Sequence, residues 1–302
     1  MADSSLTVLV VGASGHLGSA LVPLLAGQGY RVRRLVRAPR PVTPEAVHWD
    51  PDAGTLDAAA LEGVDAVVNL AGERIAALRW TRAKKTRISR SRVGGTRLLA
   101  ETLAALERRP RVFLSASAVG YYGDRGAEVL TEESPPGHTF LARLCREWEA
   151  AALPARRAGI RVVHLRTANV LDARRGFLAP LLPLFRLGLG GRLGSGRQYV
   201  PWIAIDDWVR AVAHLLVTES VDGPVNLAAP QQVTNAEFTR TLARVLGRPA
   251  VAVVPAFALR LVMGELGREI LASQRVQPAR LLVSGFTFEY PTLEEALRHL
   301  LR

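Results

Sequence analysis

The sequence predicts an α/β fold, in which a doubly wound parallel sheet carries a smaller C-terminal lobe. Strand-like and helix-like segments alternate along the first 172 residues, which is the pattern of a parallel sheet covered by helices on both faces. A glycine-rich turn joins the first apolar run to the first helical segment. After residue 172 the alternation stops, and a stretch rich in Gly, Pro and Leu begins.

The expected elements of the first part follow in chain order. The run at residues 6–11 is apolar and of strand length, and residues 31–36 alternate as a half-buried strand does. Further short strands are expected at residues 47–49, 66–70, 112–116 and 162–165. Helices are expected from the glycine turn to about residue 27, over residues 80–108 and over residues 140–157.

The chain is expected to divide into two parts that alternate along the sequence. Residues 1–172 form the sheet domain, and residues 200–232 return to it. Residues 173–199 and 233–302 form a lobe over a substrate, and residues 249–302 of that lobe are a small helical closing module. We see no internal repeat and no low-complexity linker between the two parts.

Local signals refine the second part. The segment "IDDW" is expected to start a helix capped by Asp206 or Asp207. "GPVNLAAP" is expected to be the strand that returns to the sheet. Thr234 and Glu237 have the spacing of a capping box at the start of another helix. One strand is expected near residues 286–290.

The composition favours a protein of a reducing compartment. The 302 residues are 49% hydrophobic, enough for one large domain or two closely joined ones. Cys145 is the single cysteine, so no internal disulfide can form. No basic segment precedes the first apolar run, and no apolar stretch is long enough to span a bilayer. We expect a cytoplasmic protein with no membrane partner.

The net charge of +12 raises the question of nucleic-acid binding. Lys84 and Lys85 are the only lysines, and arginines are scattered through every region, which favours a solvated basic surface. The dense basic run at residues 79–92 keeps a DNA-binding patch open as the alternative. We expect a small-molecule substrate, no nucleic-acid partner, and a monomer or homodimer.

The strongest motif is "VLVVGASGHLG", which places Gly12, Gly15 and Gly18 between a strand and a helix. Glycines at these positions let the backbone turn sharply and approach a pyrophosphate, which then lies at the helix N-terminus. The strand before and the helix after are the context that this motif requires. The motif therefore predicts dinucleotide binding by a Rossmann-type domain, against the alternative of an ordinary glycine-rich turn.

The end of the second strand bears on which dinucleotide binds. NAD-selective sites usually have an acidic residue there, which binds the ribose 2′-hydroxyl. This chain has "RRLVRAPR" with no carboxylate, and Arg37 stands where the acid is expected. A guanidinium suits a 2′-phosphate. We therefore expect NADP(H) as the cofactor, although an arginine in so arginine-rich a chain is also ordinary surface.

Further motifs support a family resemblance. "NLAG" at residues 69–72 and "SASAVGYYG" at 115–123 resemble the short-chain dehydrogenase/reductase superfamily. "LRTANV" and "GSGRQYVPWIAIDD" resemble its extended, sugar-nucleotide epimerase-like branch. "RWTRAKKTRISRSRVGGTR", "TEESPPG", "FRLGLGGRLGSGRQ" and "NLAAPQQVTNAEF" are similar to an atypical NAD-dependent epimerase/dehydratase-like group, which has a small C-terminal domain of unknown function. The resemblance runs nearly end to end, and the physiological reaction of that group is generally unassigned.

The resemblance implies cofactor contacts at particular positions. The pyrophosphate side of the cofactor would meet Gly12, Ser14, Gly15, His16, Leu17 and Gly18, the adenosine ribose would meet Val36 and Arg37, the adenosine would meet Leu70 and Ala71, and the nicotinamide end would meet Val170. Arg92 stands about where the superfamily usually has an Asn, a replacement typical of the atypical group. Arg92 is therefore a candidate cofactor or proton-relay contact.

The catalytic end departs from the superfamily pattern, in which a Ser polarises the substrate and a Tyr, aided by a Lys four residues later, exchanges a proton. Tyr121 has Arg125 four residues on, but "YYGDRG" has the composition of a turn, so the two side chains are not expected to meet. On the helix where the extended branch has this pair, Leu141 and Cys145 occupy the Tyr and Lys positions. The usual proton-transfer pair is absent.

Three substitutes remain open. Ser117 keeps the superfamily's Ser position and is either a polarising group or a serine bonded to the local turn. Tyr121 or Tyr122 is either a relocated acid or a ring that packs over the nicotinamide or the substrate. Cys145 is either a redox-sensitive thiol or, as is more usual, a buried packing residue. We choose Ser117 and Tyr121 as catalytic candidates and expect no metal site.

The substrate loop also departs from the resemblance. Extended epimerases usually have an Arg that binds the diphosphate at the position of Val200, and a His at that of Ala204. Arg192 and Arg197 lie close by in sequence and either bind an anionic group or belong to a solvated loop. We expect an NADP(H)-dependent oxidoreductase or epimerase-like enzyme acting on a small carbonyl or alcohol. The alternative is a non-catalytic NADP(H)-sensing protein.

Overall fold

The centre of the molecule is an eight-stranded sheet with the strand order β12-β8-β6-β5-β1-β2-β3-β4. The computed structural model describes residues 6–37, 43, 45–75 and 79–302. The strands are β1 (Thr7–Val11), β2 (Arg31–Val36), β3 (Ala46–Asp50), β4 (Thr55–Leu56), β5 (Ala66–Asn69), β6 (Val112–Ala118), β8 (Arg161–Thr167) and β12 (Gly223–Leu227). All neighbours pair in parallel except β3 and β4. The predicted Rossmann-type, doubly wound sheet is confirmed.

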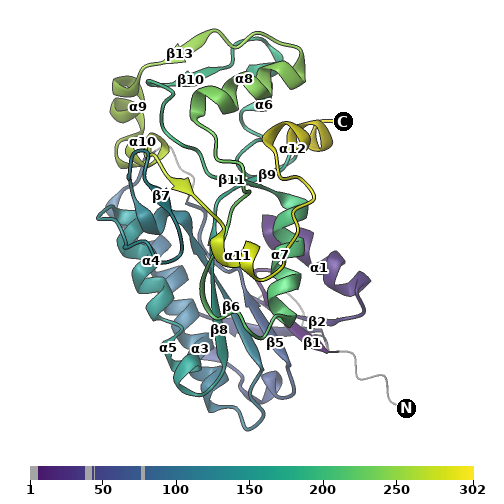
Figure 1. Ribbon diagram of the computed structural model, residues 1–302. Coiled ribbons are helices and arrows are strands. Elements are labelled where there is room, and N and C mark those ends of the chain that lie inside the picture. Colours follow the sequence, from purple (N-terminus) through teal and green to yellow (C-terminus); the bar gives the residue numbers. More distant parts are fainter. Residues whose placement is uncertain (1–5, 38–42, 44, 76–78) are drawn as a thin grey trace.

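Helices cover both faces of this sheet (Figure 1). Helices α1 (His16–Gly27) and α7 (Ile205–Val217) share one hydrophobic core with Val8 and Val10 of β1. Helices α3 (Gly95–Ala105) and α5 (Leu153–Arg157) share the other core with Leu9 and Val11. Successive residues of one strand therefore enter opposite cores, which explains why β1 is apolar throughout.

The long helix expected over residues 80–108 is present in three continuous parts. Helix α2 (Arg82–Ser89) passes into a π turn over Arg90–Gly94, which leads directly into α3. The helix expected over residues 140–157 is divided into α4 (Phe140–Ala150) and α5, with Pro154 in the first turn of α5. A π turn inserts an extra residue into a helical turn and is frequent at functional sites.

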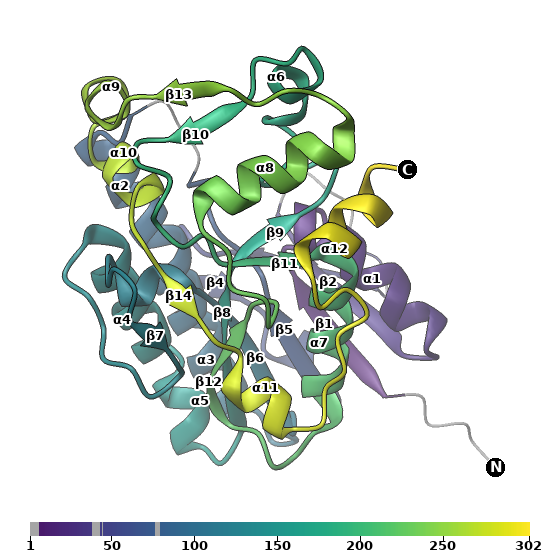
Figure 2. The ribbon, with the colours of Figure 1, turned by 45° about the horizontal axis from the view of Figure 1, so that its top comes forward.

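The second lobe lies at the far end of the molecule from α3 and α5 (Figure 1), and Figure 2 shows β10 and β13 side by side across it. Its elements are α6 (Leu182–Arg186), β10 (Gly191–Leu193), α8 (Asn235–Leu246), β13 (Ala252–Val254), α9 (Ala256–Met263), α10 (Glu265–Ile270) and α12 (Leu293–Leu300). Two short strand pairs join the parts: β9 (Asn169–Leu171) with β11 (Trp202–Ala204), and β7 (Val129–Leu130) with β14 (Arg275–Val276). Helix α11 (Ala279–Val283) packs beside β12.

Two local expectations for the second part were wrong, and Asp207 is involved in both. Neither Asp206 nor Asp207 caps α7, because both lie inside its first turn. The carboxylate of Asp207 instead accepts hydrogen bonds from the backbone N–H groups of Glu289 and Tyr290, at 2.8 and 2.9 Å. Those N–H groups cannot pair with a neighbouring strand, and residues 286–290 form no strand.

Other expectations for this part were confirmed. Thr234 and Glu237 form the predicted capping box at the start of α8. β12, from "GPVNLAAP", returns to the sheet beside β8. Among the residues described, no helix combines the length and the apolar character needed to cross a membrane.

Candidate functional site

The carboxyl ends of β1 and β5 mark the candidate site. The chain runs outward from β1 to β2 and β3, then crosses back to β5, β6 and β8 on the other side. In open α/β sheets the crevice for ligands lies at this reversal point, beyond the carboxyl ends of the strands. The glycine-rich turn between β1 and α1 occupies it.

The glycines of this turn are required by close backbone contacts. Gly12 has a φ of +79°, and a Cβ there would lie 2.9 Å from the carbonyl carbon and oxygen of Leu70. A Cβ on Gly18 would lie 2.4 Å from the carbonyl oxygen of Gly12. Asn69 shapes the opposing turn, because its side-chain oxygen accepts a hydrogen bond from the backbone N–H of Ala71 at 3.2 Å. The structure thus brings the predicted residues Leu70 and Ala71 against the loop.

The N-terminus of α1 carries no side-chain cap and no acidic residue in its first turn. Gly15 stands at the N-cap position, and Ser14 beside it is exposed. The helix dipole and N–H groups that are not bonded within the helix favour an anion at such a terminus. The backbone of this loop therefore fits the pyrophosphate that the motif predicts.

His16 connects the glycine loop to the segment after β9. Its Nε2 lies 2.9 Å from Oδ2 of Asp172. Gly176 leaves room for the ring, since a Cβ there would lie 2.6 Å from Cε1 of His16. The next loop residue, Leu17, is partly buried against the core of the sheet. The His16 side chain thus joins two segments more than 150 residues apart, which the motif alone did not predict.

Two further predicted contacts lie at the edges of this crevice. Arg37 is exposed and follows β2 directly, next to the half-buried Val36. Asp50 at the end of β3 has a lowered pKa, chiefly because it accepts backbone hydrogen bonds, and the charge of Arg37 adds to the effect. Val170 is buried on β9, beside Ile203 of β11.

Ser117 lies at the carboxyl end of β6 and is bonded to an ion pair. Its hydroxyl donates to Oε1 of Glu149 at 2.7 Å. Glu149 also accepts two hydrogen bonds from the guanidinium of Arg166, both at 2.9 Å. Burial opposes the charge of Arg166, but this two-fold pairing outweighs burial and raises its pKa. The Ser117 hydroxyl is thus bonded to a carboxylate 32 residues away rather than to the local turn.

The same network continues to Tyr122. Arg166 donates to the phenol oxygen of Tyr122 at 3.1 Å, and the Tyr122 hydroxyl donates to Oδ1 of Asn226 at 2.7 Å. Burial raises the pKa of Tyr122 to about 12. Tyr122 is fully buried and bonded, so its ring belongs to the protein core rather than to the surface of a cleft.

Tyr121 has a cation beside it, but from an unexpected part of the chain. The guanidinium carbon of Arg166 lies 3.5 Å from the centroid of the Tyr121 ring. Arg125 instead pairs with Glu128, and Gly123 has a φ of +66°, as the composition of this turn predicted. The Tyr121 side chain is only partly buried.

The face of α4 that resembles the Tyr–Lys helix is apolar and covered. Leu141 packs against Gly120, where a Cβ would lie 3.1 Å from that of Leu141. Cys145 is buried, with Sγ 3.6 Å from the carbonyl oxygen of Ala118. Burial, together with the charge of Glu149, raises the pKa of the Cys145 thiol to about 12. Neither side chain supplies a charge or a proton at neutral pH.

Sequence reasoning missed Glu149, Arg166, Glu132 and Asn226, which together enclose Ser117 and Tyr122. A signal was present: Arg166 lies within a strand in the interior of the sheet, where a charged side chain needs a buried partner. The position of that partner, on a helix 17 residues earlier, is not readable from the strand itself. Arg92, a predicted cofactor or proton-relay contact, is buried on the π turn.

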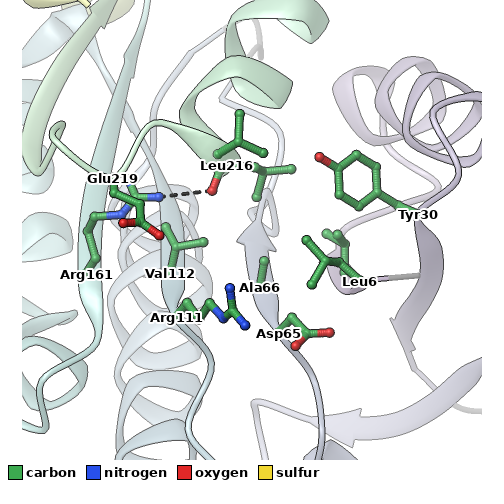
Figure 3. Close-up of a pocket in the computed structure, with 11 residues that line it drawn as sticks. Leu6, Tyr30, Asp65, Ala66, Arg111, Val112, Arg161, Leu216 and Glu219 are labelled. Carbon is green, nitrogen blue, oxygen red and sulfur yellow. Dashed lines mark hydrogen bonds between the residues drawn. The ribbon is translucent and has the colours of Figure 1, made fainter. Parts of the chain in front are cut away.

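A pocket of about 370 Å³ lies at the opposite edge of the sheet (Figure 3). It is lined at the amino ends of the strands, with Asp65, Arg111 and Arg161 among its polar residues. Arg161 donates to the carbonyls of Leu215 and Leu216 at the end of α7. The side chain of Arg161 thus completes the helix end, and the pocket is separate from the crevice at the carboxyl ends. In the part of the chain that the structure describes, no group of three His, Cys, Asp or Glu forms a metal site.

Comparisons with known proteins agree with this geometry. An epimerase family protein of Mycobacterium leprae is 42% identical over 99% of this chain and 96% of its own length. The structure of human epimerase family protein SDR39U1 (isoform 2), solved with NADPH, has 34% identity and a TM-score of 0.89, and covers 98% of this chain and 99% of that one. MoeE5, solved with UDP-glucuronic acid and NAD, covers 96% of each chain at 24% identity and a TM-score of 0.77, which shows a shared fold.

Family models cover both parts of the chain. A domain of unknown function, DUF1731, matches residues 254–300. The model of the NAD dependent epimerase/dehydratase family matches residues 8–228, which include the glycine loop and the β6 segment with Ser117. The resemblance read from the motifs is confirmed, and this chain belongs to the NAD dependent epimerase/dehydratase family.

Proposed function

We propose that this protein is an NADP(H)-dependent oxidoreductase or epimerase-like enzyme that transfers hydride to or from a small carbonyl or alcohol. The observation that carries the proposal is the glycine loop, whose contacts with Leu70 and Gly12 leave space only for backbone at an uncapped helix N-terminus. The human relative solved with NADPH supports NADP(H) as the cofactor. Because a more distant relative was solved with NAD, Arg37 is the residue that decides the preference.

Different residues of this chain would bind different parts of the cofactor. The backbone of residues 12–18 binds the pyrophosphate, and Arg37 binds the 2′-phosphate. The nicotinamide, when bound, supplies the hydride chemistry. Ser117 and Tyr121 remain our candidates for polarising the substrate and donating a proton. Tyr121, beside Arg166, is the better placed of the two, since the proton of Ser117 is already bonded to Glu149.

The test of the cofactor proposal is a pair of fluorescence titrations with NADPH and NADH. We expect NADPH to bind at least 10-fold more tightly, because a charge-assisted contact to the 2′-phosphate contributes about that much. Arg37→Ala should remove most of the preference. Arg31→Ala is the matched control, since Arg31 is exposed at the other end of the same strand. Equal dissociation constants for the two cofactors in the wild type would contradict NADP(H) selectivity.

A second function is favoured by the covered catalytic end: an NADP(H)-sensing protein whose bound cofactor sets a conformation read by a partner. Leu141 and Cys145 supply no proton, and the hydroxyl of Ser117 is held by Glu149. A screen of carbonyl substrates that follows NADPH absorbance separates the two functions. Turnover that Ser117→Ala abolishes supports the enzyme. Tight NADPH binding with no turnover on any carbonyl supports the sensor.

A further inference from the structure

We infer that Arg92 is the cation of the nicotinamide half of the cofactor site, where its guanidinium binds the ribose of that half in place of the absent lysine. The inference rests on the proposed function, because it takes a dinucleotide as the ligand. It goes further by naming one side chain, one part of the ligand and the origin of the positive charge.

The hydrogen bonding of the Arg92 side chain supports this inference. The side chain is only 8% exposed, and Nη1 donates to the carbonyl oxygen of Glu73 at 2.8 Å. Its Nε is buried and has no hydrogen-bond partner among the residues that the structure describes. Leaving a buried donor of a charged group unsatisfied is costly, so such a donor calls for a specific explanation. An acceptor on a bound ligand is one that the site permits.

The position of Arg92, near the carboxyl ends of the sheet strands, also supports the inference. Its guanidinium lies against Gly72, three residues after the end of β5, and it is near the thiol of Cys145, which contacts Ala118 at the end of β6. Arg37 follows β2, and the glycine loop follows β1. Neighbouring strands are about 4.8 Å apart, so these three points succeed one another over about 10 Å. A dinucleotide with its adenosine at β2 and its pyrophosphate at β1 places its nicotinamide half at β5 and β6.

The positive charge of the Arg92 guanidinium also supports the inference. Burial lowers the pKa of Arg92 to about 10, so the guanidinium remains charged at neutral pH. Arg166, the other buried arginine among the residues described, already donates to Glu149, Tyr122 and a backbone carbonyl. Cys145, at the lysine position of the resemblance, is neutral. Arg92 therefore supplies a positive charge near the position where α4 has the neutral Cys145.

The surroundings of the guanidinium hold it in one orientation. A Cβ on Gly72 would lie 2.9 Å from Cζ of Arg92, so only glycine lets the group lie on this turn. The guanidinium carbon is also 5.0 Å from the centroid of the Trp148 ring. The π turn over Arg90–Gly94 includes the residue, and turns of this kind are frequent at functional sites. Gly72 of "NLAG" and Arg92 thus form one structural unit.

The test measures the dissociation constants of two probes by isothermal titration calorimetry. The probes are NADPH and 2′,5′-ADP, which has the adenosine and the 2′-phosphate but no nicotinamide ribose. Arg92→Met should weaken NADPH binding about 10- to 100-fold, the range for a charge-assisted contact, and should leave 2′,5′-ADP binding within two-fold. Arg92→Lys should recover part of the loss. Arg90→Met, in the same π turn but exposed, is the matched control and should change neither.

Gly72→Ala is the second variant, because it displaces the guanidinium without removing the charge, and the atoms that the new Cβ meets belong to a side chain and not to the backbone. It should weaken NADPH binding selectively, while thermal unfolding verifies that both variants fold. Unchanged NADPH affinity in Arg92→Met, or an equal loss for both probes, would overturn the inference and leave the cofactor proposal standing. Failure of the wild type to bind either probe would overturn both.

Discussion

The two ends of the crevice are built in different ways. At the cofactor end, the β1–α1 loop is formed by backbone, and Gly12 and Gly18 are required because any side chain would meet a carbonyl group. At the catalytic end, Ser117 and Tyr122 are held by side chains that come from α4, β8 and β12. A site formed by backbone can be recognised in the sequence by the positions of its glycines. A site formed by side chains from distant segments has no comparable signal in the sequence.

The difference also predicts how each end responds to substitution. The glycine loop has no space for a single added methyl group, and its contacts are local in the sequence or to the next strand. The catalytic end depends on buried charge, because Glu149 and Arg166 have little solvent around them and stabilise each other. Substitutions at the first end should act on the ligand, and those at the second end should act on the stability of the fold.

The largest expected effect is that of Gly18→Ala. The added Cβ would lie 2.4 Å from the carbonyl oxygen of Gly12 and 2.7 Å from Cα of Ala13, both of which belong to the backbone. The loop must shift, so we expect NADPH binding to fall by more than about 100-fold and the free energy of unfolding to fall by about 2 kcal/mol. Fluorescence titration and urea denaturation measure these two quantities.

Gly27→Ala is the matched control for this prediction. Gly27 lies in the same helix, and nothing is within 4 Å of a Cβ placed there. Alanine should stabilise the helix by up to about 1 kcal/mol and leave NADPH binding unchanged. If Gly18→Ala bound NADPH like the wild type, the loop would not be the backbone-built site that we describe.

The second prediction concerns the buried pair of the catalytic end. Glu149→Gln leaves the charge of Arg166 without a carboxylate, so the free energy of unfolding should fall by about 3 kcal/mol. The double variant Glu149→Gln with Arg166→Met should cost less than the sum of the two single variants. Asp222→Asn breaks the exposed pair with Arg156 and should cost less than about 1 kcal/mol. Equal effects at the buried and exposed pairs would remove the distinction between the two ends.

Most of the fold was predictable because its signals are local. The apolar runs and glycine turns predicted seven of the eight sheet strands to within about three residues, but not β4, and Thr234 with Glu237 predicted a helix start. The strand expected near residues 286–290 was wrong, because Asp207, some 80 residues earlier, binds the backbone of that segment. A contact over such a separation has no trace in the local pattern.

The candidate site follows the same division. The glycine loop and Leu70 were both expected at the cofactor, and they do lie together, because they follow the carboxyl ends of neighbouring strands. The cation beside Tyr121 was not expected, because Arg166 comes from a different strand and not from the four-residue spacing to Arg125. Spacing along the chain predicts helix neighbours, but it does not predict which side chains meet across a sheet.

The third prediction concerns the hydrogen bond between Ser117 and Glu149. Ser117→Ala removes the hydroxyl that donates to Glu149, and the free energy of unfolding should fall by about 1 kcal/mol. Ser115→Ala is the control on the same strand, since its buried hydroxyl has no partner and its removal should be neutral or stabilising. NADPH affinity should stay within two-fold for both. A large loss of NADPH affinity in Ser117→Ala would place this residue with the cofactor end instead.

The smallest expected effect is a pH dependence from Glu132. Its Oε1 accepts hydrogen bonds from the backbone N–H groups of Asn226 and Arg280, but its Oε2 is buried and has no partner in the described part of the chain. Burial raises the pKa of this carboxyl above its ordinary value, so the folded protein holds the proton more tightly than the unfolded chain. The ionised form therefore lowers stability at neutral pH, and this cost disappears as the pH falls through the raised pKa.

Glu132→Gln should remove this dependence, because the amide stays neutral at every pH and its oxygen can still accept both backbone hydrogen bonds. Relative to this variant, the wild type should gain unfolding free energy as the pH falls from 7 toward the ordinary glutamate range. Urea denaturation at several pH values measures the difference, with exposed Glu133→Gln as the control. A difference that is constant with pH would mean that Glu132 is bonded through both oxygens in solution. The Glu132 carboxylate would then have a hydrogen-bond partner for each oxygen. An unsatisfied buried charge would no longer distinguish the catalytic end from the cofactor end.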